Sequence, residues 1–582
     1  MHMEPTKEKV VDEFRQILKK YWGYNSFRGI QEEIILSIAQ GKDTLGLMPT
    51  GGGKSITFQV PAMAKEGTCL VITPLIALMK DQIANLRQRG IRALCIHSAM
   101  SREEMVTTLE NAIYGNYKFL YIAPERLSTD IFRIKLRKIN ISMIAVDESH
   151  CISQWGYDFR PAYLQIAALR ELLPGIPILA LTATATPETV TDIQEKLQFA
   201  QPNVFRMSFE RKNLAYIVRH TTDKQKELLH ILQSMTGSAI VYTRSRANTQ
   251  EICQLLLQKG LTAEFYHAGL NHAEKENRQQ RWQTGASRVM VATNAFGMGI
   301  DKADVRLVIH MDLPDSMEAY FQEAGRAGRD GNRAYAVALC DNKDAPKLKR
   351  RVAENFPEKE TIQKIYEQLQ YYYQMAMGDG LGCRRDFDID DFCRKFKLFP
   401  TQVHSALKLL TLAGYINYVY DQESASLLSF TVSRDELYRL QHLGKEADLL
   451  INILLRQYTG LFTAVAIINE DLLATLSGLT RQQVYEQLVH LSKLRIVKYI
   501  PRKQTPYIIY TRERREASSL ALPPAVYEER LERMKQRIEA MLNYIGHGEE
   551  CRSQLLLNYF GETQQDRCGQ CDTCIALRKQ KT

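Results

Sequence analysis

Short apolar runs, each ended by small, polar or charged residues, recur along the chain from residue 43 to about 340. Most of them are followed by a stretch with helical periodicity, and this alternation is typical of α/β domains with parallel sheets. The predicted strands form two groups: Thr44–Met48, Cys69–Thr73, Phe119–Ile122, Met143–Val146 and Ile178–Leu181, then Ala239–Tyr242, Ala263–Tyr266, Val289–Ala292, Leu307–His310 and Tyr335–Leu339. We place the break between the groups at residues 201–211 and expect two parallel-sheet lobes that meet there.

The alternation stops after residue 340, where a charged, mainly helical connector runs to about residue 377. Residues 388–419 then predict two helices and a strand. From residue 449 the pattern recurs as three helices followed by the strands Ile496–Ile500 and Tyr507–Thr511, which we expect to pair as a hairpin with its tip at 501–506. Both blocks are typical of winged helices, which hold a helix or a wing against a duplex. A helical packing domain is the alternative for each block.

These patterns divide the 582 residues into five predicted regions, a number that suits a chain of this length. They are a first lobe (1–208), a second lobe (209–345), a connector with the first candidate winged helix (346–440), the second candidate winged helix (441–515) and a helical C-terminal module (516–582).

Composition narrows the class of protein. Hydrophobic residues make up 45% and charged residues 24% of the chain. No apolar run reaches the roughly 18 residues that a membrane-spanning helix needs, so we expect no membrane association. The charged N-terminus shows no secretory signal, which predicts a reducing compartment. The net charge of +10 is compatible with a polyanionic partner without establishing one.

A glycine-rich segment, Met48–Ser55, follows the first predicted strand and precedes a helix, and Thr50 belongs to it. In that context backbone N–H groups can approach phosphate oxygens, Lys54 can place a cation on the β- and γ-phosphates, and the Ser55 hydroxyl can bind Mg²⁺. A simple glycine-rich turn is the alternative. The glycines of the segment are Gly51, Gly52 and Gly53.

Two adjacent carboxylates, Asp147 and Glu148, end the predicted strand Met143–Val146. They emerge from the sheet edge with different orientations, so each can perform a different step of the reaction. Asp147 would complete the Mg²⁺ coordination, and Glu148 would deprotonate the water that attacks the γ-phosphorus. Such a pair is usually a solvated surface pair, but the apolar strand before it and the phosphate loop upstream favour the catalytic interpretation.

Together with this phosphate loop, Asp147–His150 resembles the superfamily two helicases, and the wider set of motifs resembles the RecQ family of DNA helicases. The resemblance covers about residues 20–340 and includes Ile72–Gln82, Ala123–Arg126 and Ala180–Thr186. It implies two RecA-like lobes that hydrolyse ATP, translocate 3′ to 5′ on single-stranded DNA and unwind duplex junctions in DNA repair or recombination. The bacterial cytoplasm, at the nucleoid, is the location that it implies.

The resemblance also implies an adenine-recognition element before the phosphate loop. Tyr24 would stack on the base, while Arg28 and Gln31 would read it. A glutamine amide has one donor and one acceptor group, which can pair with N7 and N6 of adenine. The element would therefore favour ATP.

In the second lobe, Ala292–Asp301 and Tyr320–Gly331 match further family motifs. Gln322 belongs to the second motif, and its Arg326 and Arg329 resemble arginine fingers, which stabilise the charge of the transition state. A basic surface turn is the alternative. Because these arginines and the phosphate-loop lysine belong to different lobes, hydrolysis would remove a bond that holds the lobes together.

The segment Cys151–Pro161 matches the aromatic-rich loop of the RecQ family, which links DNA contact to hydrolysis. His150, Trp155, Phe159 and Arg160 would form this DNA-coupling element. Aromatic side chains can stack on unpaired bases whatever their identity, and an arginine can contact phosphate. Without the resemblance, an aromatic cluster is more often part of a core.

Four of the eleven cysteines, Cys551, Cys568, Cys571 and Cys574, lie in the last 32 residues. Their spacing supplies four thiolates for a tetrahedral Zn²⁺ ion, and the segment resembles the RecQ zinc-binding module. Four thiolates leave no open position for water, so we expect a structural role. An iron–sulfur cluster is the main alternative, followed by unligated cysteines.

The order of the domains departs from the usual RecQ arrangement, in which the zinc module follows the second lobe directly and the winged helix comes last. Here both candidate winged helices precede the cysteines. The element that separates the strands is therefore not assigned. An RNA-remodelling ATPase of the same superfamily and a non-catalytic DNA-binding scaffold are the alternative functions.

Overall fold

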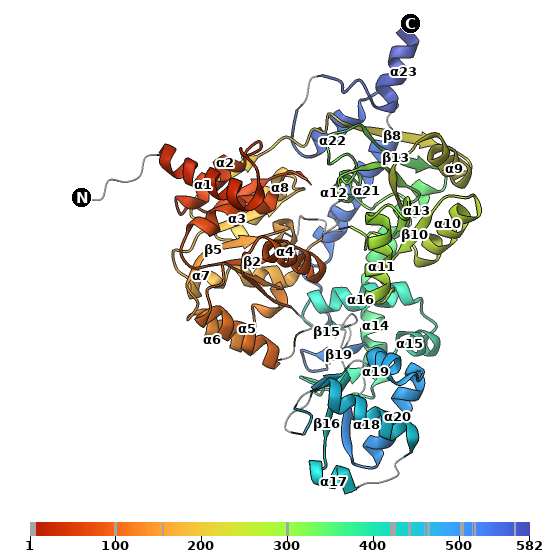
Figure 1. Ribbon diagram of the computed structural model, residues 1–582. Coiled ribbons are helices and arrows are strands. Elements are labelled where there is room, and N and C mark those ends of the chain that lie inside the picture. Colours follow the sequence, from red (N-terminus) through yellow and green to blue (C-terminus); the bar gives the residue numbers. More distant parts are fainter. Residues whose placement is uncertain are drawn as a thin grey trace. The chain divides into compact units, whose positions relative to one another are not determined.

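The computed structural model describes residues 7–49, 51–97, 100, 102–153, 156, 158–297, 302–419, 426–439, 444–458, 460–462, 466–468, 470–500, 506–514, 516, 519–546, 548–563 and 566–581. Figure 1 labels its helices and strands. The chain forms two compact units. The first contains Met1–Ser98, Arg102–Val352 and Glu529–Thr582, and the second contains Ala99–Ser101 and Ala353–Glu528.

The first lobe is built on a seven-stranded sheet of order β3-β4-β2-β5-β6-β1-β7, whose described pairings are all parallel. Every residue of β1, β2, β4 and β6 is buried, so helices must cover both faces of the sheet. The strands are β1 (Thr44–Leu47), β2 (Thr68–Ile72), β3 (Ala93–Ile96), β4 (Phe119–Ile122), β5 (Ile141–Val146), β6 (Ile178–Thr182) and β7 (Val204–Arg206). The helices are α1 (Lys7–Trp22), α2 (Gln31–Ala39), α3 (Lys54–Ala64), α4 (Ile76–Gln88), α5 (Arg102–Tyr114), η1 (Pro124–Arg126), α6 (Asp130–Leu136), η2 (Ser149–Ile152), η3 (Pro161–Ile166), α7 (Leu169–Leu172) and α8 (Pro187–Lys196).

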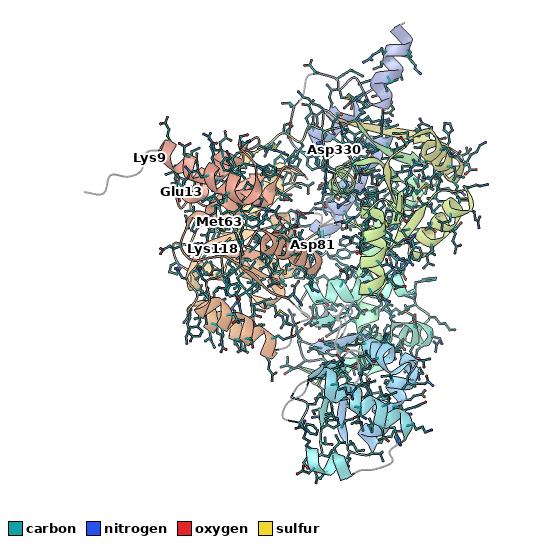
Figure 2. All side chains as sticks on the ribbon, viewed as in Figure 1. Lys9, Glu13, Met63, Asp81, Lys118 and Asp330 are labelled. Carbon is teal, nitrogen blue, oxygen red and sulfur yellow. The ribbon has the colours of Figure 1, made fainter. Side chains whose placement is uncertain are left out.

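Helix α1 shows how the sequence pattern sets the packing of a covering helix. Val11, Phe14 and Leu18 are buried, whereas Lys9 and Glu13 are exposed (Figure 2). The buried residues are three and four positions apart, so they share one face of the helix.

The second lobe has a six-stranded sheet of order β10-β11-β9-β12-β13-β8, and its described pairings are also parallel. The prediction of two RecA-like α/β lobes is therefore confirmed. The elements are β8 (Leu214–His220), α9 (Lys224–Ser234), β9 (Ser238–Tyr242), α10 (Arg246–Gln258), β10 (Ala263–Tyr266), α11 (His272–Gln283), β11 (Val289–Ala292), β12 (Val305–His310), α12 (Met317–Ala324), β13 (Ala334–Cys340) and α13 (Asp344–Asn355).

All the predicted strands of the two lobes are present, but the sequence prediction missed β3, β7 and β8. Strands β3, β7 and β8 lie at sheet edges. An edge strand is buried less completely, and the apolar run that marks it is interrupted or short. Strand β7 lies within the predicted break at 201–211 and completes the first sheet, while β8 opens the second.

The second unit contains two small antiparallel sheets, β14-β19-β15 and β17-β16-β18, each accompanied by helices. The elements before and around the first sheet are α14 (Lys359–Tyr372), β14 (Arg384–Asp386), α15 (Ile389–Phe396), α16 (Pro400–Leu412), β15 (Ile416–Val419) and β19 (Tyr507–Tyr510). Those of the second are β16 (Ser426–Phe430), α17 (Arg434–Arg439), α18 (Lys445–Gln457), β17 (Ala466–Ile468), α19 (Glu470–Ser477), α20 (Arg481–Lys493) and β18 (Val497–Ile500).

The predicted hairpin between the last two strands is wrong. Strand β18 pairs with β16, whereas β19 pairs with β14 and β15. The second winged-helix block is thus inserted between β15 and β19 of the first block. The inserted block has its own hydrophobic core, whose buried members all lie between Leu428 and Tyr499.

The C-terminal module belongs to the first unit, together with both lobes. It consists of α21 (Glu528–Gly546), α22 (Arg552–Tyr559) and α23 (Asp572–Lys581). The ring of Phe560 lies 5.0 Å from that of Phe209 and 5.2 Å from that of Phe321. None of the helices in the described ranges combines the length and apolar character that a membrane crossing requires.

Candidate functional site

The phosphate loop joins β1 to α3. Gly53, which caps the N-terminus of α3, has φ +76°, and Gly51 has φ +85°. Both values lie in the left-handed region that favours glycine. Helix α3 begins at Lys54, so the free N–H groups of its first turn face the loop. Thr50, a predicted member of the site, lies outside the described residues.

Lys54 is paired with the second carboxylate at the end of β5. Its Nζ lies 3.3 Å from Glu148 Oε1, and the two side chains are only 14% and 10% exposed. Burial acts to lower the pKa of Lys54, but the carboxylates of Glu148 and Asp147 outweigh it and raise that pKa above its ordinary value. The lysine is therefore a fixed positive charge at the phosphate loop.

The two adjacent carboxylates differ in their protonation behaviour. Burial raises the pKa of Asp147 to about 6, although Lys54 opposes the shift. Burial acts to raise the pKa of Glu148, but the positive charge of Lys54 and of other nearby groups outweighs it, so the pKa of Glu148 is lowered. The backbone of Glu148 is left-handed, with φ 48°, and its N–H donates to Asp147 Oδ1 at 2.9 Å. A strained backbone of this kind is common at functional sites, and it points the two side chains in different directions.

A chain of polar contacts runs from Glu148 to the second lobe. His150 Nδ1 lies 3.4 Å from Glu148 Oε2 and 2.9 Å from Thr182 Oγ1 at the end of β6. The Thr182 hydroxyl donates to the carbonyl of Thr184 at 3.3 Å. Across the boundary between the lobes, Gln322 Nε2 lies 3.5 Å from Thr184 Oγ1. The sequence prediction included His150 and Gln322 but not the threonines between them.

Both predicted arginine fingers face the first lobe. Arg326 is 5% exposed, donates to the carbonyl of Gly297, and contributes to the lowered pKa of Glu148. A Cβ built on Gly51 would lie 3.4 Å from Arg329 Cγ, so the Arg329 side chain lies against the phosphate loop. The structure thus brings Lys54, Glu148 and the two guanidinium groups together.

The predicted adenine-recognition residues contact the phosphate loop and one another. Gln31 is 4% exposed; its Nε2 donates to the carbonyls of Gly52 and Gly53 at 3.1 and 3.2 Å, and its Oε1 accepts from the Arg28 amide at 2.9 Å. The guanidinium of Arg28 lies 5.4 Å from the ring centroid of Tyr24, which is 49% exposed. Gln31 therefore supports the phosphate loop, a contact that the sequence did not predict.

The Ser55 hydroxyl is also held from a neighbouring element. Gln82 Nε2 on α4 donates to Ser55 Oγ at 3.3 Å, and Tyr121 OH on β4 donates to Gln82 Oε1 at 2.8 Å. Ser55 and Asp147 are both oxygen donors, the kind that Mg²⁺ prefers, and they come from the loop and the strand end that meet at Lys54. This donor set fits a magnesium ion bound with a nucleotide.

The aromatic-rich loop is described only in part, and Trp155 lies outside the described residues. Arg160 forms an ion pair with Asp158 at 3.1 Å and lies 3.4 Å from the carbonyl of Pro74, so its guanidinium is engaged within the lobe. The ring centroid of Phe159 lies 5.4 Å from the guanidinium carbon of Arg530 on α21.

The four C-terminal cysteines converge. Their sulfur atoms all lie within 4.8 Å of one another, and those of Cys551 and Cys571 are 3.9 Å apart. Four thiolates around one Zn²⁺ ion with Zn–S bonds of about 2.3 Å would be about 3.8 Å apart, so the arrangement fits a single tetrahedral zinc ion. An iron–sulfur cluster would place several irons and sulfides between the thiolates and needs a wider arrangement. The predicted zinc centre is confirmed.

The residues on either side of Cys571 form hydrogen bonds with the second lobe. Asp572, directly after Cys571, pairs with Arg552 at 3.1 Å and lies 3.4 Å from the amide nitrogen of Val218 on β8. Gln570 Nε2 donates to the carbonyl of Leu214 at 3.1 Å. The zinc centre thus fixes the loop that attaches the module to the edge strand of the second sheet, in agreement with a structural role.

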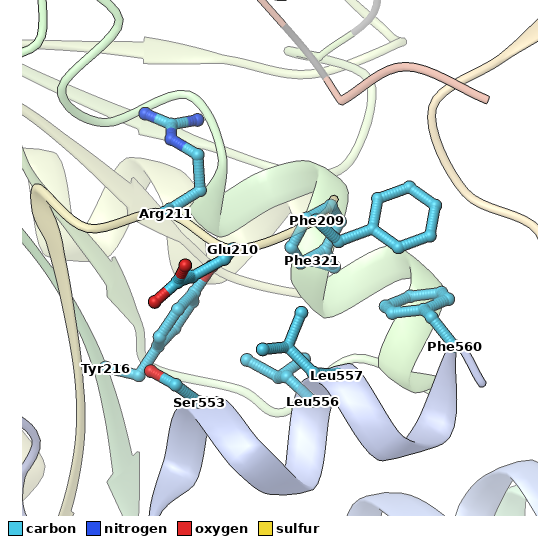
Figure 3. Close-up of a pocket in the computed structure, with 9 residues that line it drawn as sticks. All are labelled: Phe209, Glu210, Arg211, Tyr216, Phe321, Ser553, Leu556, Leu557 and Phe560. Carbon is cyan, nitrogen blue, oxygen red and sulfur yellow. The ribbon is translucent and has the colours of Figure 1, made fainter. Parts of the chain in front are cut away.

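Glu562 contacts the segment that joins the two lobes. Its carboxylate accepts hydrogen bonds from Ser208 Oγ at 2.7 Å and from the Phe209 amide at 2.8 Å. Phe209 also lines a small pocket with Phe321 and, from the C-terminal module, Leu556 and Phe560 (Figure 3). The sequence prediction gave Glu562 no role, although this residue ends the segment that resembles the zinc-binding module.

Four family models match the chain: DEAD/DEAH box helicase at 28–193, helicase conserved C-terminal domain at 223–331, RecQ helicase winged-helix domain (Bacteroidota) at 428–501 and RecQ zinc-binding at 511–575. The third model coincides with the inserted block and confirms that it is a winged helix.

Several curated relatives are named ATP-dependent DNA helicase RecQ. The protein of Pasteurella multocida is 40% identical over 385 residues, which are 66% of this chain and 60% of the relative. That of Bacillus subtilis is 44% identical over 333 residues, which are 57% and 56% of the two chains. This chain therefore spans less than two thirds of either relative.

Among solved structures, the DUF1998 helicase MrfA bound to DNA matches with a TM-score of 0.50 and 16% identity, over 60% of this chain and 54% of that one. This likeness concerns the fold of the two lobes alone. Together, the paired lobes with their nucleotide motifs, the winged helix and the four-cysteine zinc module show that this chain belongs to the RecQ family of superfamily two helicases.

Proposed function

We propose that the chain is an ATP- and Mg²⁺-dependent DNA helicase that translocates 3′ to 5′ on single-stranded DNA and unwinds duplex junctions in DNA repair or recombination. The bacterial cytoplasm, at the nucleoid, is the proposed location. The observation that carries the proposal is the convergence of the first-lobe phosphate loop with Arg326 and Arg329 of the second lobe. A nucleotide bound by both lobes makes their closure depend on its hydrolysis.

In the proposed reaction Glu148 accepts the proton of the attacking water at its carboxylate. Its lowered pKa keeps it ionised at neutral pH, as a general base requires. Lys54 stabilises the β- and γ-phosphates. To do so, it gives up its ion pair with Glu148 and contacts the phosphates instead. Ser55 and Asp147 would hold Mg²⁺, which neutralises phosphate charge when bound.

The arginines complete the proposed site from the second lobe. Arg326 and Arg329 stabilise the negative charge that develops on the transferred phosphoryl group. Gln322 contacts Thr184, which belongs to the chain of polar contacts that starts at Glu148. A change at Glu148 during hydrolysis can therefore reach Gln322 in the second lobe. Hydrolysis and the spacing of the lobes are thereby coupled.

Recognition of the base is proposed for Tyr24, Arg28 and Gln31. The exposed ring of Tyr24 is available for stacking. The Gln31 amide would exchange its contacts with the phosphate-loop carbonyls for the edge of adenine, which would couple base recognition to the conformation of the loop.

DNA contact is proposed at the aromatic-rich loop. Trp155 and Phe159 would stack on unpaired bases, and His150 would relay their movement to Glu148. Arg160 would contact phosphate only after exchanging its ion pair with Asp158. The two winged helices would bind the duplex part of a junction.

Strand displacement on duplexes with a single-stranded tail of either polarity, with and without ATP, tests the proposal. We expect ATP-dependent displacement on 3′-tailed duplexes only. Displacement without ATP, or on neither substrate, would contradict it. An RNA-remodelling ATPase predicts hydrolysis that RNA stimulates more than single-stranded DNA does, and a DNA-binding scaffold predicts no hydrolysis with either.

A further inference from the structure

Helix α21 of the C-terminal module presents three residues at heptad spacing to the two lobes. Arg530, Arg537 and Tyr544 are seven residues apart, so they lie on one face of the helix. The first and last of them are about 21 Å apart along the helix axis. Figure 1 labels α21 and α12, and both Met317–Ala324 of α12 and Glu529–Gly546 of α21 belong to the first unit.

The N-terminal half of α21 contacts the aromatic-rich loop. The guanidinium of Arg530 lies over the ring of Phe159, near the end of that loop. Burial lowers the pKa of Arg530, and the positive charges of Arg537 and Arg533 lower it further, so it is held against this ring at an electrostatic cost. At the start of the loop Ser153 Oγ donates to Asp192 at 2.6 Å.

Asp192 connects the start of the loop to the same helix. Its charge acts on Arg533, whose pKa is lowered by burial while the carboxylates of Glu529 and Asp192 oppose the shift. Both ends of the aromatic-rich loop are therefore within the electrostatic reach of one helix face.

The C-terminal half of α21 contacts α12, the helix that carries Gln322 and leads into both arginine fingers. Arg537 lies 3.9 Å from the carboxylate of Glu318, which is 4% exposed. The Tyr544 ring packs on that of Tyr320 at 5.1 Å, and their hydroxyl oxygens are 3.4 Å apart. A displacement of α21 therefore acts on α12 through two contacts one heptad apart.

We infer that α21 is a positioning element that couples the aromatic-rich loop of the first lobe to the arginine-bearing loop of the second. Arg530 is its contact with the first loop, and Arg537 and Tyr544 are its contacts with the helix that precedes the second. The inference rests on the proposed function and adds a second route by which DNA contact at the aromatic-rich loop influences ATP hydrolysis. The first route leads from the loop through His150 to the catalytic carboxylate within one lobe. The second crosses to the other lobe through the zinc module and gives that module a part in the ATPase cycle.

Steady-state ATP hydrolysis by the whole 582-residue chain, without DNA and with saturating oligo-dT, tests the inference on Arg530→Ala, Arg530→Lys and Arg537→Gln. Lys535→Ala, on an exposed position of α21, is the matched control. Thermal unfolding and zinc content verify that each variant is folded, and fluorescence anisotropy gives the Kd for labelled oligo-dT.

We expect Arg530→Ala and Arg537→Gln to lower the DNA-stimulated kcat about fivefold or more, the order that loss of one desolvated guanidinium contact supports. Hydrolysis without DNA and the Kd for oligo-dT should stay within about twofold of wild type, because neither arginine contacts the phosphates or the DNA in this account. Arg530→Lys keeps a cation over the ring and should restore most of the stimulation, and Lys535→Ala should behave as wild type.

An unchanged DNA-stimulated kcat in Arg530→Ala would overturn the inference, even if Arg537→Gln failed to fold. A weakened Kd with a normal kcat at saturating DNA would also overturn it, because that result assigns Arg530 to DNA contact. If oligo-dT did not stimulate the wild-type protein, the proposed function itself would fail, and the inference with it.

Discussion

Gln322 Nε2 lies 3.5 Å from Thr184 Oγ1, and the two residues belong to different lobes. Thr184 is joined through Thr182 and His150 to Glu148, the proposed general base. The second lobe therefore contacts the hydrolytic site by two separate means, a polar side chain at this relay and the guanidinium groups at the phosphate loop. We therefore propose that closure of the lobes and proton acceptance by Glu148 depend on each other.

Replacement of Glu148 by glutamine should abolish turnover without abolishing nucleotide binding. Glutamine keeps the shape of the side chain but cannot accept the proton of the attacking water, so we expect kcat to fall by about 10²–10⁴-fold. The Kd for ATP should stay the same or decrease, because Lys54 loses its internal partner. Single-turnover hydrolysis and equilibrium binding of a fluorescent nucleotide measure the two effects. Glu195→Gln, on an exposed position of α8, is the control, and wild-type turnover in Glu148→Gln would contradict the assignment.

Replacement of Cys571 by serine should remove the metal and destabilise the C-terminal module. Serine is a poor zinc ligand, and the free energy of zinc binding is part of the folding free energy of such a module. We expect the zinc content to fall from about one ion per chain to near zero and the Tm to fall by several degrees. Cys383→Ser, outside the cluster, should keep its zinc. Full zinc content in Cys571→Ser, or iron in the wild-type protein, would contradict the zinc centre.

Replacement of Glu562 by alanine should destabilise the junction between the two lobes and the zinc module. The carboxylate accepts two hydrogen bonds from the inter-lobe segment, and their loss should lower the free energy of unfolding by about 1–3 kcal/mol. Urea unfolding monitored by circular dichroism measures this difference. Glu549→Ala, in an exposed loop of the same module, should change it by less than about 0.5 kcal/mol. Equal stability of both variants would show that Glu562 does not hold the segment.

The inserted winged helix should be removable without loss of the remaining fold. Val419 and Tyr507 are direct partners in the β15–β19 pairing, so a two-residue Asn-Gly turn can replace residues 420–506. The inserted block also has a core of its own. We expect the shortened protein to be resistant to limited proteolysis within residues 353–419 and 507–528 and to hydrolyse ATP without DNA within about twofold of wild type. Rapid proteolysis of these segments would show that the two blocks fold as one.

Much of the nucleotide site was predictable because its residues lie in short, continuous motifs between apolar strands. The pairing of β19 was not, because neighbouring strands usually pair with each other, and here an inserted domain separates the true partners. The contact of Glu562 with Phe209 joins residues 353 positions apart, and that of Arg530 with Phe159 likewise crosses most of the chain. Contacts at such separation follow from the tertiary fold and leave no local pattern.

The measurement that tests the central claim most directly is ATP hydrolysis at saturating single-stranded DNA by Arg329→Ala, with Arg434→Ala as a charge-matched control outside both lobes. Arg329 comes from the second lobe and lies against Gly51 of the phosphate loop in the first. If the two lobes share one nucleotide, kcat should fall by about 10³-fold while the variant keeps its zinc, its Tm and its affinity for DNA. Hydrolysis at the wild-type rate by Arg329→Ala would contradict the claim.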